Sequence, residues 1–268
     1  MDRPLYINWI VKEADSIIKD NISMECYLID YKDDDDIIDE WALHIRRNYI
    51  DDNVLTDCVS NYKVPVEHYL RQYIIPQRNE VLGPSARSGD ICEIIVSDLL
   101  EFVFDYSVPR YKLMNRSGKN NSEHGTDVIA YKFHKEDKTP NKNDELIAAE
   151  VKGTLSKAGY ESLENAITDS VKDEYRLSRT IDYCRKRLKE LRKENEAHDI
   201  TRFLMKAEND YQIIYTAAGI SSQEVVDPII ELSVSGEELH IRQGQKIFFL
   251  HGKKLMELTH KIYERCIK

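Results

Sequence analysis

One aspartate and a short motif downstream of it have the residue types that metal-assisted phosphodiester chemistry requires. Asp127 follows a polar loop, and Glu150-Val151-Lys152 ends the apolar run of residues 146–149. Hydrolysis of a phosphodiester needs an activated water and compensation of the charge that builds on the phosphate, and a divalent metal held by oxygen ligands supplies both. We expect Asp127, Glu150 and the Val151 carbonyl to bind Mg²⁺ or Mn²⁺. Lys152 would orient the water, lower its pKa or neutralise charge on the phosphate.

The carboxylate-x-lysine pattern is short, so its surroundings decide how it is interpreted. Charged residues make up 32% of the chain, and the same pattern recurs at residues 30–32 and 136–138. Both of these lie in polar surroundings, whereas residues 150–152 end a run typical of a strand buried on both faces. The alternative interpretation is an exposed ion pair at the edge of a strand.

Two predicted strands, at residues 126–133 and 145–152, position the three side chains. Because residues two apart on a strand share a face, Glu150 and Lys152 point to the same side. Asp127 lies near the start of the neighbouring strand. We therefore expect Asp127, Glu150 and Lys152 to converge.

A helix upstream offers a fourth acidic group, Glu93. Residues 90–104 carry an apolar helical face with Glu93 at its polar edge. The spacing of Asp90 and Glu93 also fits a capping box at the helix start, so Glu93 either caps the helix or completes the site. Residues 108–114 read as a strand that follows this helix.

The chain divides into an N-terminal region and a core. Residues 1–83 are predicted to be an acidic helical region, with apolar stripes at residues 7–18 and 37–49, that packs on the core or faces a partner. A Gly-Pro pair marks the boundary with a core at residues 84–268.

Long helices are predicted after the motif. Residues 177–191 carry apolar positions in alternating steps of four and three, which fits either a helix facing the core or a surface for a partner helix. Strands at residues 229–234 and 246–250 and an amphipathic helix at residues 255–263 complete the pattern.

The composition excludes several classes of protein. With 268 residues and 41% hydrophobic content, the chain can bury a sizeable core. Its apolar runs are far shorter than the roughly 20 residues of a membrane span, and its start does not resemble a signal sequence, so we expect a cytoplasmic protein. Five widely spaced cysteines without a CxxC pair predict neither a disulfide framework nor a zinc site.

The net charge of −10 disfavours non-specific binding of nucleic acid, but the charge is unevenly distributed. Residues 1–60 carry 15 acids against 6 Lys and Arg, whereas residues 172–206 carry 11 Lys and Arg against 7 acids. A basic surface is therefore available. Productive binding is expected to need a metal, a partner or a particular substrate shape.

Isolated residues around the motif are candidates for contacts with the DNA backbone. They are Arg116, Lys119, His124 and Lys157, although such side chains also serve simply as solvated surface groups. The chain lacks a GxxxxGK[ST] phosphate-binding loop, so a motor would have to come from a partner.

Taken together, Glu93, Asp127 and Glu150-Val151-Lys152 resemble the PD-(D/E)xK nuclease superfamily. The resemblance implies a restriction-endonuclease-like core, with a central mixed β-sheet flanked by helices. In that superfamily the helix glutamate often completes the metal site, a role that would fall to Glu93. Thr126 stands where the superfamily pattern has proline, which reduces the specificity of the motif.

A narrower resemblance is to the HamA family, the nuclease subunits of the bacterial Hachiman antiphage system. It is carried by residues 89–93, by the approach to Asp127 at residues 124–127, and by residues 150–152. It implies a complex with the helicase HamB, which restrains the nuclease until infection or DNA damage is sensed.

Two other functions stay open at this point. One is a stand-alone restriction or repair endonuclease of the same fold, and the other is a catalytically inactive interaction subunit. The preference for DNA over RNA also remains undecided.

Overall fold

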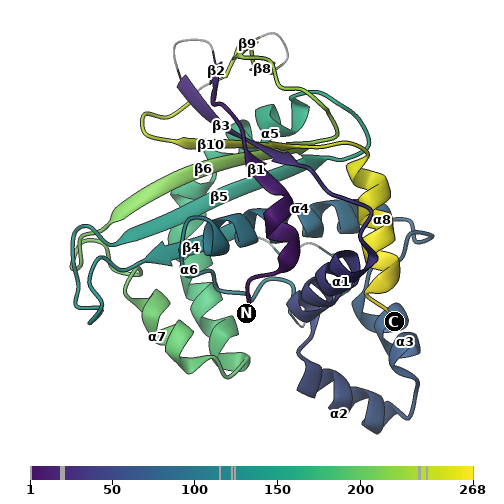
Figure 1. The fold of residues 1–268 in the computed structure, drawn as a ribbon. Helices are drawn as coiled ribbons and strands as arrows, with labels where there is room; N and C mark the ends of the chain where they lie inside the picture. Colours follow the sequence, from purple (N-terminus) through teal and green to yellow (C-terminus); the bar gives the residue numbers. More distant parts are fainter. Residues whose placement is uncertain are drawn as a thin grey trace.

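A mixed β-sheet runs through the middle of the molecule, with helices on both of its faces (Figure 1). This computed structural model describes residues 2–18, 22–114, 116–121, 123, 125–234, 237–239 and 241–267. Within this part of the chain, eight strands form the sheet. The predicted α/β architecture with a central mixed sheet is confirmed.

The strands of the sheet come from both ends and from the middle of the chain. They are β1 (Ile10–Lys12), β2 (Ser16–Ile18), β3 (Ile22–Ile29), β4 (Val128–Lys132), β5 (Glu145–Thr154), β6 (Gln212–Ser221), β7 (Ile229–Ile230) and β10 (Lys246–His251). Their order is β4-β5-β6-β10-β3-β2-β7, and β1 pairs with β3. Strands β5, β6, β10 and β3 are parallel, and β4 is antiparallel to β5. A separate pair consists of β8 (Ser233–Val234) and β9 (Glu237–Glu238).

Helices cover the two faces of the sheet. One face packs against α1 (Asp35–Tyr49), α4 (Gly83–Phe102) and α8 (Leu255–Arg265), and the other against α5 (Glu161–Ser170), α6 (Asp173–Glu190) and α7 (Glu194–Thr201). The remaining helical segments are η1 (Leu5–Trp9), α2 (Asp52–Tyr62), α3 (Val66–Tyr69) and the π-helical turn η2 (Leu70–Ile74).

Alternation along β5 decides which helices the motif meets. Ile147, Ala149 and Val151 pack in the cluster that contains α4, whereas Leu146 and Ala148 pack in the cluster that contains α6. Residues two apart share a face, so the side chains of the two charged motif positions, which follow Leu146 and Ala148 in register, point towards α5 and α6.

Two glycines let helices approach the motif closely. A Cβ at Gly153 of β5 would lie 2.3 Å from Sγ of Cys92 on α4. A Cβ at Gly219 of β6, the register partner of Lys152, would lie 2.7 Å from the backbone of Leu163 on α5. Only a residue without a side chain leaves room for these contacts, which bring α4 and α5 to either side of the motif.

The predicted N-terminal helix at residues 7–18 is wrong. These residues form η1, β1 and β2, and the following β3 pairs in parallel with β10 within the main sheet. Isoleucine and valine are β-branched and suit strands, and the pairing partner lies near the other end of the chain, so the local pattern did not reveal it. Residues 1–83 are thus helical mainly from α1 onward, and they share a sheet with residues beyond 83.

The start of α4 also differs from the prediction. The helix begins at Gly83 with Pro84 in its first turn, where a missing N–H is tolerated. Asp90 and Glu93 therefore lie inside the helix, and the capping-box interpretation is wrong.

Two strand assignments near the site need correction. Residues 108–114 are not a strand: Ser107 alone makes an isolated bridge, to Tyr131, and Pro109 lacks the N–H that a continuing ladder would need. The prediction missed β6, which lies between β5 and β10 and whose second half is buried without alternation between faces.

The helices and strands predicted after the motif are present, although one predicted strand is divided into two. The apolar positions of α6 from Leu177 to Leu188 are buried in the core, so this seam faces the sheet rather than a partner helix. The predicted strand at residues 229–234 is divided into β7 and β8, while β10 and α8 lie where predicted. In the described residues, no helix combines the length and apolar character needed to cross a membrane.

Candidate active site

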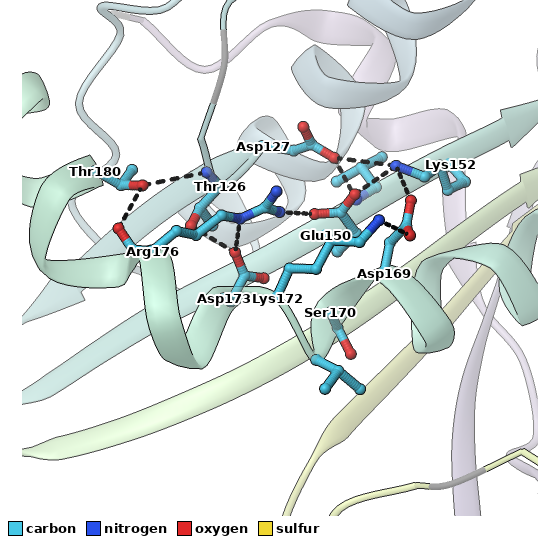
Figure 2. Close-up of polar contacts among 12 residues, drawn as sticks. Thr126, Asp127, Glu150, Lys152, Asp169, Ser170, Lys172, Asp173, Arg176 and Thr180 are labelled. Atoms are coloured by element: carbon cyan, nitrogen blue, oxygen red, sulfur yellow. Dashed lines mark hydrogen bonds and ion pairs between the residues drawn. The ribbon is translucent and has the colours of Figure 1, made fainter.

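Asp127, Glu150 and Lys152 lie together beside β5 (Figure 2). Val128 of β4 pairs with Ala149 of β5, so the same register continued by one residue sets Asp127 opposite Glu150. Asp127 Oδ2 accepts a hydrogen bond from the Val151 N–H at 2.9 Å. The antiparallel pairing of an edge strand therefore brings two acids distant in sequence to one point.

Glu150 is almost completely buried, at 3% exposure, and both of its oxygens are bound. Lys152 donates to Oε1, and Arg176 of α6 donates to Oε2. Burial raises the pKa of Glu150 to about 7, and repulsion from Asp127 acts in the same direction, while Lys152 and Arg176 oppose it. The side chain is thus an acid whose charge is expensive to hold without a further cation.

Lys152 connects the motif to α5. Besides Glu150, its ammonium lies 3.3 Å from Oδ2 of Asp169 on that helix and 4.0 Å from Oδ2 of Asp127. Its side chain is one-third exposed, so it can reach a bound substrate. The exposed pair of Lys32 with Asp30, at 2.7 Å, shows what the same sequence pattern does elsewhere as a simple ion pair.

Glu93 reaches the cluster from α4 through an intermediary. Both of its oxygens lie 3.2 Å from the ammonium of Lys112, which is 2.8 Å from Oδ1 of Asp127. Burial raises the pKa of Glu93 to about 8, with Lys112 lowering it and repulsion from Asp127 raising it further. Of the two alternatives for Glu93, these contacts fit the one in which it reaches into the site; its role as a metal ligand stays a prediction.

Two side chains at the start of α6 connect the residues just before β4 with β5. Oδ1 of Asp173, which is fully buried, accepts from the Thr126 hydroxyl at 2.6 Å and from Nε of Arg176 at 2.8 Å (Figure 2). Because Arg176 also holds Glu150, this one carboxylate links the approach to β4 with β5. The arrangement fixes the relative positions of the predicted ligands.

Sequence interpretation missed Lys112, Asp173 and Arg176. The last two had a weak signal, an acid and a base three residues apart on the predicted helix that follows the motif. Lys112 had none, because it lies in a segment without regular structure that we interpreted as a strand.

The three candidate DNA contacts that the structure describes are not gathered at this site. Arg116 is nearly buried and pairs with Asp90 at 2.8 Å, and Lys119 donates to the Arg71 carbonyl at 2.8 Å. Lys157 is exposed beside Glu161, and His124 lies outside the described residues. Their roles in binding DNA stay predictions.

The donor set suits a hard divalent cation. Carboxylate oxygens are the ligands that Mg²⁺ and Mn²⁺ prefer, and burial first, then repulsion from Asp127, raises the pKa values of Glu93 and Glu150, a cost that such a cation would relieve. Across the described residues, no three acidic, histidine or cysteine side chains are already arranged around one point. Basic side chains lie on the carboxylate oxygens instead.

The sheet, the flanking helices and the acid–lysine cluster define an α/β protein with a nuclease-like core. A search of curated proteins found no match. The family model for HamA matches residues 4–266, nearly the whole chain. The chain belongs to the HamA family and is a protein of Hachiman defence.

Proposed function

We propose that this protein is a divalent-metal-dependent nuclease that cleaves DNA as the effector of Hachiman defence. The observation that carries the proposal is the convergence of Asp127, Glu150 and Lys152 at one buried edge of the sheet. A structural ion pair would need one acid and one base. Here the carboxylates of Asp127 and Glu150 are held together against their mutual repulsion, which is typical of functional sites.

Each residue has a distinct part in the proposed reaction. Asp127 and Glu150 would hold the metal, with Glu93 and the Val151 carbonyl completing the ligands, and Lys152 would position the attacking water or balance charge on the phosphate. The bound metal would lower the pKa of a water and stabilise the leaving oxygen. Arg176 and Asp173 would hold Glu150 in place while negative charge builds on the phosphate during hydrolysis.

A partner is part of the proposal. The acidity of residues 1–60 opposes free association with DNA, whereas the Lys and Arg residues of α6 and of the segments on either side of α7 offer a local surface for the backbone. We propose that a helicase subunit of the HamB kind brings DNA to the site and restrains cleavage until infection. Membership of the HamA family supports this assignment.

Cleavage of plasmid DNA under Mg²⁺ and Mn²⁺ titration tests the proposal, with and without the helicase subunit. Glu150→Ala and Lys152→Ala should each reduce cleavage by more than about 100-fold while the protein stays folded, because they remove a ligand and a charge. Lys32→Ala is the matched control, since its carboxylate partner lies on the exposed surface. Equal cleavage by all the proteins would refute the assignment of Glu150 and Lys152 to the active site. No cleavage by any of them at any metal concentration would favour an interaction subunit.

A further inference from the structure

Lys112 is the most deeply placed basic group of the candidate site. Its ammonium lies within 3.2 Å of both oxygens of Glu93 and 2.8 Å from Oδ1 of Asp127, and its side chain is only 9% exposed. These three oxygens belong to two of the proposed metal ligands. The Lys112 ammonium therefore contacts the same oxygens that a bound divalent cation would contact.

The position of Lys112 differs from that of Lys152. Lys152 is one-third exposed and lies between the buried Glu150 and the partly exposed Asp169, where a substrate phosphate can approach. Lys112 is buried beneath the acids, so its ammonium is poorly placed to meet DNA. Its positive charge instead stabilises the ionised carboxylates of Glu93 and Asp127.

The backbone around Lys112 leaves room for the ammonium to move. The segment from Val108 to Leu113 belongs to no helix or strand of the sheet, so no ladder of hydrogen bonds fixes it. A cavity of about 30 Å³, enough for one water, is lined by Glu93, Lys112 and Asp127. A shift of the side chain does not require the core to open.

We propose that Lys112 is an internal cation that occupies the Glu93–Asp127 half of the metal site, and that metal binds by displacing its ammonium. Two cations compete for the same oxygens, so Lys112 sets the metal concentration at which the site fills. The inference rests on the proposed function and adds a control to it: without metal, the Lys112 ammonium offsets part of the charge of Glu93 and Asp127 and holds the two carboxylates in place.

Calorimetric titration with MnCl₂ and thermal unfolding test the proposal in variants of Lys112. Lys112→Met should bind Mn²⁺ about tenfold or more tightly than the unchanged protein, since a competing charge at contact distance is removed. Its metal-free form should unfold at a lower temperature, and Mn²⁺ should raise that temperature by more. Lys112→Gln, which keeps a donor for Asp127 without the charge, should show the same gain in affinity.

Lys132→Met is the matched control, because Lys132 pairs with the exposed Asp105 in the loop after α4, 3.2 Å away. It should bind Mn²⁺ like the unchanged protein. Unaltered or weaker Mn²⁺ binding in both Lys112 variants would overturn the inference. Binding that is equally tight in Glu150→Ala and the unchanged protein would instead show that the metal does not use this site, which refutes the proposed function.

A measurement on the unchanged protein removes any dependence on the folding of variants. Acetylation of lysines by an activated acetyl ester, followed by mass spectrometry, reports how accessible each ammonium is. Mn²⁺ should increase modification of Lys112 several-fold relative to Lys132. A rate for Lys112 that is unchanged or slowed by Mn²⁺ would contradict displacement.

Discussion

Helix α4 carries two buried acidic clusters, and they are built in opposite ways. Asp98 is fully buried and meets Arg110 at 2.6 Å, His44 at 2.9 Å and the Tyr6 hydroxyl. Although burial acts to raise it, the pKa of Asp98 is lowered, because Arg110 and His44 outweigh that effect. Just over one turn earlier, Glu93 shares one lysine with Asp127, and its pKa is raised.

The comparison separates a structural acid from a candidate functional one. Burial alone does not mark a site, because both acids are buried. In the Asp98 cluster the opposite charges and hydrogen bonds compensate the carboxylate, so the cluster is stable as it stands. In the Glu93 cluster one lysine faces two carboxylates, so the cost of burying Glu93 is not offset, and this cost is explained if a cation completes the site.

The largest expected effect comes from breaking the compensated cluster. Asp98→Ala leaves the guanidinium of Arg110 buried with only part of its partners, and removing one member of a buried pair typically costs about 3–5 kcal/mol. Urea unfolding measures this loss. Asp57→Ala, on the exposed surface of α2, should change the unfolding free energy by less than about 0.5 kcal/mol. A similar loss of unfolding free energy in both variants would show that Asp98 contributes no more to stability than an exposed acid does.

The second effect is a dependence of Mn²⁺ affinity on pH, which is expected because the Glu93 cluster, unlike the Asp98 cluster, contains acids with raised pKa values. A carboxyl must release its proton to bind metal, and the pKa values of Glu150 and Glu93 are raised to about 7 and about 8. Mn²⁺ affinity should therefore rise by roughly 500-fold from pH 6 to pH 8 and level off above about pH 9. Calorimetry at several pH values checks this, and Glu93→Gln should flatten the curve. A constant affinity would mean that these acids are not the ligands.

The smallest effect concerns the link between α6 and the acids. Arg176→Lys keeps the charge, but one ammonium does not reproduce the planar fork that contacts Asp173 and Glu150 through different nitrogens. Cleavage should fall about tenfold, as is usual when a residue behind a metal ligand is changed. The exposed Arg179 on the same helix provides the control, Arg179→Lys. If both variants cleave equally well, Arg176 does not position Glu150.

Much of the candidate site could be predicted because its signals are local. The apolar run before Glu150 indicated a buried strand, and the two-residue period put Lys152 on the same face, as the structure has it. The apolar spacing along α6 likewise predicted a helix that faces the core. What these patterns could not convey was the identity of Lys112, Asp173 and Arg176 as partners of the acids.

By itself, the sequence determined the α/β class, the strand that carries the motif and the helices that follow it, because periodicity and apolar runs act over a few residues. Tertiary structure alone decided that residues 22–29 lie beside β10 and that β6 separates β10 from β5. It also decided which base meets which acid. Pairing between distant strands and the balance of buried charges depend on neighbours brought together only by folding, and no local pattern records them.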